Sequence, residues 1–295
     1  MSDNKKTVMA LGYFDSVHKG HRLVIQTARE LANKLNANCV VFTFKGNLKQ
    51  LVDAKDGTFV YSDEERGLMY KDLGADDVCF APVNYEFLSM GKLAFLNMLN
   101  REYEVIGYVC GNDYSFGKHK SGSIKDLKNY ASKRSQEVVV VDSVNFNDEK
   151  ISTTLVKKHL REGNLELVKE FLGHNYSITS TVVNGRGVGK DLGFPTANVL
   201  VDEGRVKLKR GVYEGKVFLD EKCYNAVVNY GIKPTFNLTE ISCEAFLIDF
   251  KGDLYGKKVR VEFVRYIREE VRFSSREELI SQIKKDVLEV QNGNN

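Results

Sequence analysis

A short histidine motif stands between the first apolar segment of the chain and its first long helical pattern. His18 and His21 flank Gly20 in the sequence His-Lys-Gly-His. Imidazoles beside a helix start, where backbone N–H groups lack partners, suit a polyphosphate, and they can donate hydrogen bonds to charge developing on a phosphoryl group. Gly20 would let the backbone approach that ligand closely. The alternative is a histidine-rich turn that merely caps the helix.

A polar segment at residues 111–117, Gly-Asn-Asp-Tyr-Ser-Phe-Gly, follows an apolar run. In doubly wound sheets, ligands bind at the loops that follow the carboxyl ends of the strands. This position makes Asp113 a candidate binding residue. The alternative is a turn-rich surface loop with an Asx turn at Asp113.

The glycine-rich stretch at residues 185–190 does not satisfy the usual patterns of a nucleotide-binding loop. A Walker A loop would need Gly at position 184 and Ser or Thr at position 191, where Asn184 and Asp191 stand. A dinucleotide fingerprint would need a following helix, and Pro195 argues against one. The pattern therefore predicts a turn between strands.

Two side chains with neutral oxygen atoms follow Pro195. In an extended segment, Thr196 and Asn198 lie on the same side, because they are two residues apart. This arrangement suits a Mg²⁺ ion held mainly by nucleotide phosphates and water, because Mg²⁺ needs few protein ligands. The alternative is a proline turn whose hydroxyl group is satisfied locally.

Glu244 interrupts an apolar segment near the end of the chain. By strict alternation along a strand it shares a face with Phe246 and Ile248, which suggests that its carboxylate points toward an apolar interior. A carboxylate in such a place needs a partner or a chemical function. A buried ion pair and a catalytic base are both open.

Strand and helix patterns alternate over the first 172 residues, which predicts a parallel sheet with helices on both faces. Apolar residues at helical spacing begin at Val24 and predict an amphipathic helix. Ser62 and Glu65 form a capping box for a helix that ends near Gly74. Strands are expected at residues 7–11, 39–44, 78–81, 105–110 and 137–141, and further helices near 93–99, 123–133, 152–161 and 164–172.

After Gly173 the helical periodicity disappears until the end of the chain. Short strands separated by turn residues predict a small closed antiparallel barrel. Ser275 and Glu278 form a capping box for a final helix, whose apolar positions include Leu279 and Val287. Strands are expected at residues 176–183, 212–219, 223–230, 242–250 and 257–264.

Composition excludes several classes of protein. The 43 Lys and Arg residues nearly balance the 40 Asp and Glu residues, so the net charge of +3 supplies no basic field for nucleic acid. The five cysteines show no Cys-x-x-Cys spacing, which argues against a structural zinc site and a disulfide framework. No apolar run reaches the roughly 20 residues of a membrane span, and the start of the chain lacks a signal-peptide pattern. We therefore expect a cytoplasmic, soluble, two-domain protein that binds neither nucleic acid nor membrane.

Taken together, these segments resemble the bifunctional riboflavin kinase/FMN adenylyltransferase family of bacteria, the prokaryotic FAD synthetases. The resemblance runs from Leu11 to about Asp286 and rests on motifs that occur in the same order, among them LGYFDSVHKGH, GNDYSFG, ISTTLVK, LGFPTANV, NYGIKPTFN and EAFLIDF. It implies an α/β Rossmann-like nucleotidyltransferase domain at residues 1–174. It also implies a riboflavin kinase domain at 175–295, an antiparallel six-stranded β-barrel with a C-terminal helix.

The resemblance also implies roles for individual residues. Glu244 is similar to the general base of the kinase, while His18 and His21 are similar to the pair that contacts ATP phosphates during adenylyl transfer. Thr196 and Asn198 are similar to the residues that hold Mg²⁺ with the nucleotide. The residues implied to bind nucleotide are Gly12, Phe14, Asp15, Gly20, Ser152, Thr153, Lys157, Gly187, Gly189, Pro195, Thr196 and Asn198. Those implied to bind flavin are Asp113, Arg268, Arg272 and Phe273.

Three segments depart from the family pattern. Ser16 replaces the usual Gly, residues 44–48 replace the usual Phe-Asp-Pro-His-Pro, and Lys157 replaces the usual Arg. Lysine keeps the charge of arginine but loses its bidentate phosphate geometry. The expected substrates are riboflavin, FMN and ATP, with Mg²⁺ as the metal, and the chain is expected to be a monomer or a weak homo-oligomer.

Two alternatives to the bifunctional enzyme stay open at the level of the sequence. One is a riboflavin kinase whose adenylyltransferase domain is weakened or lost and persists as a structural module. The other is a flavin- or nucleotide-binding regulator without turnover, against which the intact Thr196, Asn198 and Glu244 argue.

Overall fold

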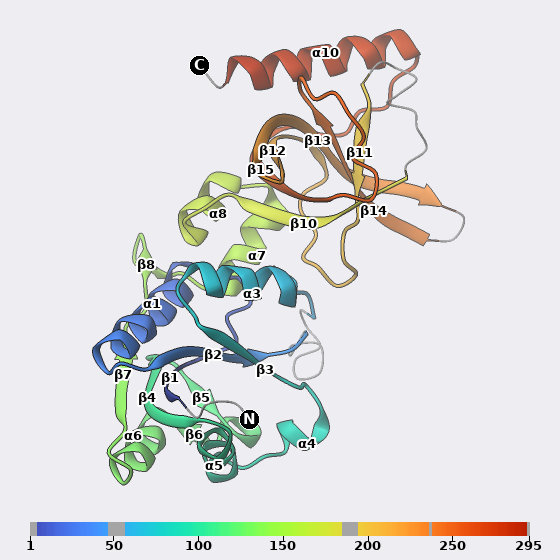
Figure 1. Cartoon of the computed structure of the whole chain (residues 1–295). Helices are drawn as coiled ribbons and strands as arrows, with labels where there is room; N and C mark the ends of the chain where they lie inside the picture. The colour runs from blue at the N-terminus through green and yellow to red at the C-terminus, as the bar shows by residue number, and fades with distance from the viewer. Residues whose placement is uncertain (1–4, 47–56, 185–193, 236–237, 294–295) are drawn as a thin grey trace. The chain divides into compact units, whose positions relative to one another are not determined.

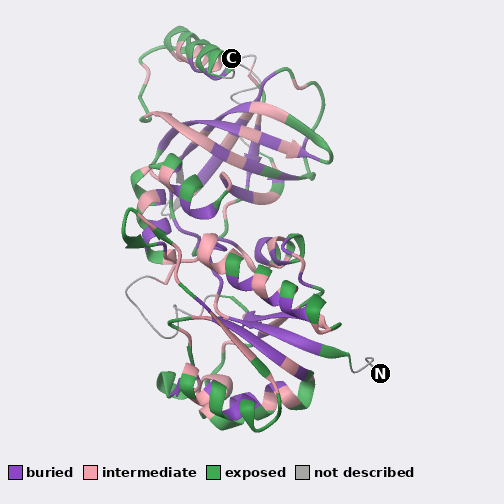
Figure 2. Ribbon diagram, turned by 90° about the vertical axis from the view of Figure 1, so that its left-hand side faces the viewer, coloured by how far each residue is buried: buried purple, intermediate pink, exposed green. Residues whose placement is uncertain are grey.

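The computed structural model describes residues 5–46, 57–184, 194–235 and 238–293, with the backbone alone at 233–235 and 238–240. The chain divides into two compact units, Met1–Val156 and Lys157–Asn295. We call them the N-terminal unit and the C-terminal unit. Buried residues concentrate in the strands of each unit (Figure 2).

The N-terminal unit is built on a parallel sheet of five strands in the order β3-β2-β1-β4-β7. All five strands lie where the sequence predicts them. The three central strands β1, β2 and β4 are buried along most of their length, as parallel strands generally are, while the edge strands β3 and β7 are mostly half-buried. The sheet consists of β1 (Lys6–Leu11), β2 (Asn38–Phe44), β3 (Asp77–Ala81), β4 (Glu104–Gly111) and β7 (Glu137–Val141). Short strands form two further pairs: β5 (Ser115–Phe116) with β6 (Gly122–Ser123), and β8 (Asn145–Phe146) with β9 (Glu149–Lys150).

Helices cover both faces of this sheet (Figure 1). On one face lie α1 (Lys19–Lys34) and α3 (Asp63–Asp72); on the other lie α5 (Lys92–Glu102) and α6 (Ile124–Ser132), with the short α4 (Tyr85–Leu88) nearby. The predicted spacing is confirmed, because Val24 and the apolar residues that follow it on α1 are buried. The predicted capping box is also confirmed: Ser62 accepts from Glu65 N, and the Glu65 carboxylate accepts from Ser62 N.

The order of the strands reverses beside β1, because the chain moves from β1 to β2 on one side and later places β4 on the other. Leu11 at the end of β1 lies between Phe42 and Cys110 of its two neighbours. The carboxyl ends of β1 and β4 therefore form the topological switch point, where ligands bind in sheets of this type. The histidine motif follows β1, and residues 112–117 follow β4.

The C-terminal unit is a closed barrel of six strands in the order β10-β11-β14-β13-β12-β15, and all its pairings are antiparallel. The helices α7 (Thr153–Glu162) and α8 (Leu165–Leu172) precede it, and α8 ends at Gly173 in the left-handed conformation. The strands are β10 (Tyr176–Val183), β11 (Thr196–Val199), β12 (Gly211–Leu219), β13 (Lys222–Thr235), β14 (Leu238–Leu247) and β15 (Lys258–Arg268).

Several details of the C-terminal unit differ from the sequence analysis. The strand β11 was not among the expected strands, β13 and β15 extend to Thr235 and Arg268, and β14 already begins at Leu238. The strand expected at 242–250 ends at Leu247, because Asp249 turns the chain with a φ of 62°. The final helix α10 (Arg276–Asn292) begins as expected with Ser275 accepting from Glu278 N. The Glu278 carboxylate, however, accepts from the N and Oγ of Ser274 instead of closing the predicted box.

Among the residues that the model describes, no helix is long and apolar enough to cross a membrane. All five cysteines are free thiols, in agreement with the absence of a disulfide framework from the sequence pattern.

Candidate active sites

His18 is the N-cap of α1. Its Nδ1 accepts hydrogen bonds from the backbone N–H groups of Gly20 (3.1 Å) and His21 (3.3 Å). The capping role that the sequence left open is therefore real, and two of the amides expected to face a ligand are occupied by the ring. Because Nδ1 accepts, the proton of the neutral ring must be on Nε2, which makes that atom a hydrogen-bond donor.

The environment keeps both imidazoles neutral at pH 7. Burial, reinforced by the positive charge of Lys150, lowers the pKa of His18 to about 4. Burial and then the neighbouring His18, Arg66 and Lys150 hold the pKa of His21 well below its usual value. The two rings stack with centroids 3.6 Å apart, so they form one unit.

Two glycines make room for the side chains of this loop. A Cβ on Gly20 would lie 3.1 Å from Cε1 of His18, so Gly20 gives space to the capping ring and not only to a ligand. A Cβ on Gly12 would lie 2.5 Å from the ring of Phe14, which in turn packs edge-on against His21. Both glycines therefore shape the position of the histidine pair.

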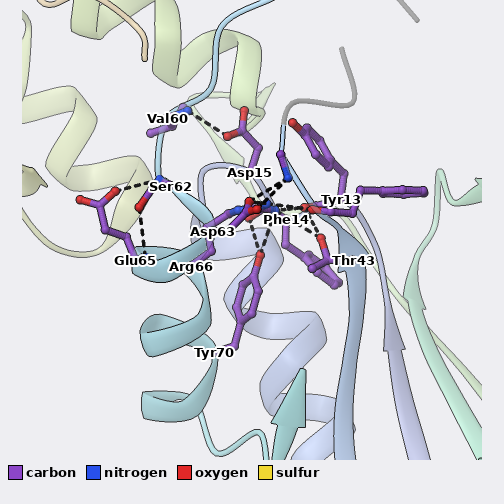
Figure 3. Close-up of polar contacts among 12 residues, drawn as sticks. Tyr13, Phe14, Asp15, Thr43, Val60, Ser62, Asp63, Glu65, Arg66 and Tyr70 are labelled. Carbon is purple, nitrogen blue, oxygen red and sulfur yellow. Dashed lines mark hydrogen bonds and ion pairs between the residues drawn. The ribbon is translucent and has the colours of Figure 1, made fainter. Parts of the chain in front are cut away.

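The loop between β1 and α1 is tied to other parts of the N-terminal unit. The buried Asp15 accepts from the N–H of Val60 at 2.9 Å (Figure 3). The Oγ of Ser16 lies 2.9 Å from Oγ1 of Thr153, a hydrogen bond that the usual glycine could not form. Ser16 has no positive φ, so its backbone does not require glycine. The Oγ of Ser152 accepts from Leu155 N in the first turn of α7.

Asp113 forms an ion pair with Lys150 (2.6 Å), which joins the loop after β4 to the end of β9. Asp113 is exposed, as a ligand-binding residue at the switch point would be. Lys150 was not identified from the sequence, although its charge acts on both histidines. The sequence signal that could have identified Lys150 is its position directly before the segment that begins with Ile151 and Ser152.

The structure describes the surroundings of two positions that depart from the family pattern. The side chain of Lys157 on α7 is fully buried. The N–H of Gly46 donates to both carboxylate oxygens of Asp63, at 3.0 and 2.8 Å, so the loop after β2 is held from α3. Asn47 and Leu48 lie outside the described residues.

In the barrel, three polar residues form a row across neighbouring strands. Asn198 of β11 lies opposite Glu244 of β14, and Glu244 lies opposite Asn229 of β13. Directly paired residues project from the same face with Cβ atoms about 5 Å apart, so these side chains are neighbours. Thr196 lies on the same face, opposite Phe246. Asn229 is a residue that the sequence analysis did not select, since only the strand register reveals it.

The face that carries Glu244 is not the interior of the barrel. Alternate residues of β14, Cys243, Ala245 and Leu247, are the ones that are almost completely buried. On the Glu244 face, Ile248 belongs to an apolar cluster with Val290 of α10, and Phe246 packs against the same cluster. The expectation of an interior carboxylate is thus corrected: the alternation holds, but it directs Glu244 to the outer face of the barrel.

The remaining predicted positions of the kinase half lie apart from this row along the sequence. Arg268 ends β15, and its Nε and Nη2 donate to the two carboxylate oxygens of Asp286 on α10. Arg272 is exposed and Phe273 half-buried in the connection before α10. Pro195 is exposed before β11, while Gly187 and Gly189 lie outside the described residues.

Within the described parts of the chain, no group of three or more His, Cys, Asp or Glu side chains could hold a metal ion. Thr196 and Asn198 offer neutral oxygens on one face of β11, with the Glu244 carboxylate beside them. This donor set fits a divalent ion that takes most of its ligands from nucleotide phosphates and water.

Comparison with protein families and known proteins assigns the two parts of the chain to two family models. Residues 1–155 match the family model of FAD synthetase, and residues 172–293 match that of riboflavin kinase. The bifunctional riboflavin kinase/FMN adenylyltransferase of Listeria monocytogenes is 32% identical over 282 residues, which cover 95% of this chain and 90% of that protein. The protein of the same name from Bacillus subtilis is 32% identical over 292 residues, covering 97% and 92%.

A solved structure, described as a macrolide-efflux protein from Streptococcus pneumoniae, is similar over almost the whole chain. It is 29% identical, with a TM-score of 0.88, and the match covers 99% of this chain and 96% of that one. It supports both the parallel sheet and the barrel.

Proposed function

Because the chain belongs to the family of bifunctional riboflavin kinases/FMN adenylyltransferases, we propose that it makes FMN from riboflavin and then FAD from FMN, using ATP in each step. The observation that carries the kinase assignment is the row in which Asn198 lies opposite Glu244, with Thr196 on the same face. The one that carries the adenylyltransferase assignment is the neutral His18–His21 pair beside the switch point of the sheet.

In the kinase step, Glu244 takes the proton of the ribityl 5′-hydroxyl group of riboflavin. The hydroxyl oxygen bonds to the γ-phosphorus of ATP while the bond to the β-phosphate oxygen breaks, giving FMN and ADP. Thr196 and Asn198 would hold Mg²⁺ together with the nucleotide, and Mg²⁺ supplies neutralisation of the phosphate charge. The residues of the chain thereby position the reactants and accept one proton.

In the adenylyl-transfer step, a phosphate oxygen of FMN bonds to the α-phosphorus of ATP and the bond to pyrophosphate breaks. The attacking phosphate is already anionic, so no side chain has to remove a proton. The Nε2–H of His18 is available to stabilise phosphate charge, since Nδ1 is engaged by the helix. Lys150 adds a positive charge beside the pair, with Asp113 as its partner.

A direct assay distinguishes this proposal from its main alternative. The purified chain is incubated with riboflavin, ATP and Mg²⁺, and FMN is separated from FAD. Both products are expected; FMN alone would indicate a kinase whose adenylyltransferase is lost, and neither product would indicate a binding protein. We still expect the enzyme to be cytoplasmic and to be a monomer or a weak homo-oligomer.

A further inference from the structure

Arg66 is a charged side chain that lies buried in the N-terminal unit. It lies on α3 with a relative exposure of 1%. Its Nη2 pairs with Asp63 (2.5 Å) and donates to the carbonyl oxygen of Phe44 (2.9 Å). Although burial opposes the charge, Tyr70 and Asp63 raise the pKa of Arg66 above its ordinary value, so the group is a permanent cation.

The guanidinium holds the loop that leads to the histidine pair (Figure 3). Its Nη1 donates to the carbonyl oxygen of Tyr13 (3.0 Å), which also accepts from Thr43 Oγ1 (2.7 Å). The Tyr70 hydroxyl, 3.5 Å from the same Nη1, donates to the carbonyl oxygen of Phe14 (3.0 Å). Two successive peptide groups after β1 are thus fixed by one cluster, which we call the Arg66 cluster: Thr43, Asp63, Arg66 and Tyr70.

The same loop contains two residues in an unfavourable backbone conformation. Phe14 and Val17 have φ values of 48° and 46°, in the left-handed region that side chains other than glycine disfavour, and β-branched ones most of all. Such residues persist where the surroundings fix them, and they concentrate at functional sites. His18 follows Val17 directly, so the position of the histidine pair depends on this conformation.

We infer that Arg66 is a positioning residue for adenylyl transfer, which fixes the Tyr13 and Phe14 peptide groups and thereby sets His18 and His21 where they meet phosphate charge. The inference rests on the proposed adenylyltransferase activity. This role requires the planar guanidinium group of arginine, because one side chain must donate to two carbonyl oxygens and a carboxylate in fixed directions.

A matched control lies at the opposite, amino ends of the strands β2 and β3. Arg29 of α1 forms a similar clamp: Nη1 donates to Asp76 (2.6 Å) and to the carbonyl oxygen of Gly74, while Nη2 donates to that of Ala37. Ala37 immediately precedes β2, so Arg29 holds the amino end of the strand whose carboxyl end Arg66 holds. Arg29→Met therefore removes a clamp of the same chemistry that does not touch the histidine loop.

The test compares Arg66→Met, Arg66→Lys and Arg29→Met in the full chain. For each variant, kcat and KM are measured for FAD formation from FMN and ATP, together with the rate of riboflavin phosphorylation and the thermal midpoint. We expect Arg66→Met to lower the kcat of FAD formation about 100-fold, the effect of a displacement of roughly 1 Å, with KM changed less than about threefold. Arg66→Lys should recover about tenfold at most, and Arg29→Met should keep kcat within about threefold.

The opposite results are equally clear. An Arg66→Met variant with a kcat within about threefold of wild type, or equal losses in Arg66→Met and Arg29→Met, would show that Arg66 only supports the fold. Should Arg66→Met fail to fold, Thr43→Val and Tyr70→Phe decide, since each removes one hydrogen bond to the loop. A kcat reduced about three- to tenfold in these two supports the inference, and an unchanged kcat overturns it.

A readout without turnover separates this inference from the proposed function. If wild type forms no FAD, the adenylyltransferase assignment fails, and the NMR signals of the His18 and His21 rings test the positioning itself. Shifted signals in Arg66→Met, with unshifted ones in Arg29→Met, support the role of Arg66. Signals that shift in neither variant, or in both alike, overturn it.

Discussion

At the scale of the residue, His18 combines a structural and a chemical role through its two ring nitrogens. Nδ1 accepts from the helix, and this leaves Nε2–H as a donor. A protonated ring could not cap the helix, and its charge would lie at the positive end of the helix dipole. The cap therefore requires the same neutral state that the proposed chemistry uses.

This arrangement predicts a dependence of stability on pH. The pKa of His18 is about 4 in the folded chain and 6.5 when unperturbed. Between these values the unfolded chain binds a proton that the folded chain does not, so the free energy of unfolding is highest above pH 6.5 and falls as the pH decreases toward 4. One such group contributes a slope of up to about 1.4 kcal/mol per pH unit.

His18→Asn should reduce that slope, because asparagine caps helices well but does not titrate. The measurement is the urea midpoint from circular dichroism at several pH values between 4 and 7.5, with His119→Asn as the control, since His119 is exposed. Equal slopes in wild type and His18→Asn would contradict the prediction.

Glu244→Gln should lower the rate of FMN formation about 10²- to 10⁴-fold, the usual effect of losing a general base. FAD formation from supplied FMN should be unchanged. Glu262→Gln is a suitable control, because Glu262 is another half-buried carboxylate of the same barrel and accepts from Asn175. A Glu244→Gln rate within threefold of wild type would refute the assignment, since threefold corresponds to only about 0.65 kcal/mol in the barrier.

At the scale of the element, local signals predicted most of the fold. The capping boxes of α3 and α6 each join residues three positions apart, so the short sequence contains all the information. The strand β11 has only four residues, and no periodicity can identify a strand of that length; its partners β10 and β14 define it.

The site residues that the sequence analysis missed owe their position to distant parts of the chain. Arg66 stands in the polar first turns of α3, within the sequence Asp-Glu-Glu-Arg, and resembles a solvent-exposed residue. Its contacts to Tyr13 and Phe44 exist only because the loops after β1 and β2 meet beside that helix. Asn229 likewise becomes a neighbour of Glu244 through strand register alone.

The helix α10 is attached to β15 by two ion pairs of different burial, which allows a matched prediction. Asp286 is almost completely buried, pairs with Arg268 through two hydrogen bonds and also accepts from Gln282. Glu289 pairs with Arg265 while 47% exposed. Asp286→Ala should cost about 2 kcal/mol, less than for a fully buried pair because Arg268 reaches solvent, and Glu289→Ala about 0–1 kcal/mol.

Denaturant midpoints of the two variants measure this difference. Equal costs would show that the second hydrogen bond and the burial of Asp286 add nothing to the attachment of α10.

At the scale of the whole molecule, the chain combines a parallel sheet and a closed barrel, each with its own buried core. The position of the boundary between them decides to which of the two α7 and α8 belong. The compact units separate after Val156, the family models leave residues 156–171 unmatched, and the sequence predicts a boundary after residue 174. A boundary at 174 stays a prediction, and fragments can test it.

The structure indicates what α8 contributes to the barrel. The helix packs against β10 and β15, and Val168, Phe171 and Leu172 are buried. The N–H of Lys209, before β12, donates to the carbonyl oxygen of Leu160 at 3.2 Å, so the end of α7 is also tied to the C-terminal unit. A fragment without these helices loses buried apolar surface worth roughly 1.5–3 kcal/mol for each large side chain.

We therefore predict that a fragment of residues 175–295 folds and phosphorylates riboflavin, because it retains all six strands and α10. A fragment of residues 153–295, which adds α7 and α8, should have the same kcat and a clearly higher thermal midpoint. The kcat of both is compared with that of the full chain, and folding is followed by circular dichroism. If residues 175–295 are unfolded while 153–295 is folded and active, the helices belong to the kinase domain and the boundary lies before them. If the two fragments have equal midpoints, the apolar face of α8 contributes nothing to the stability of the barrel.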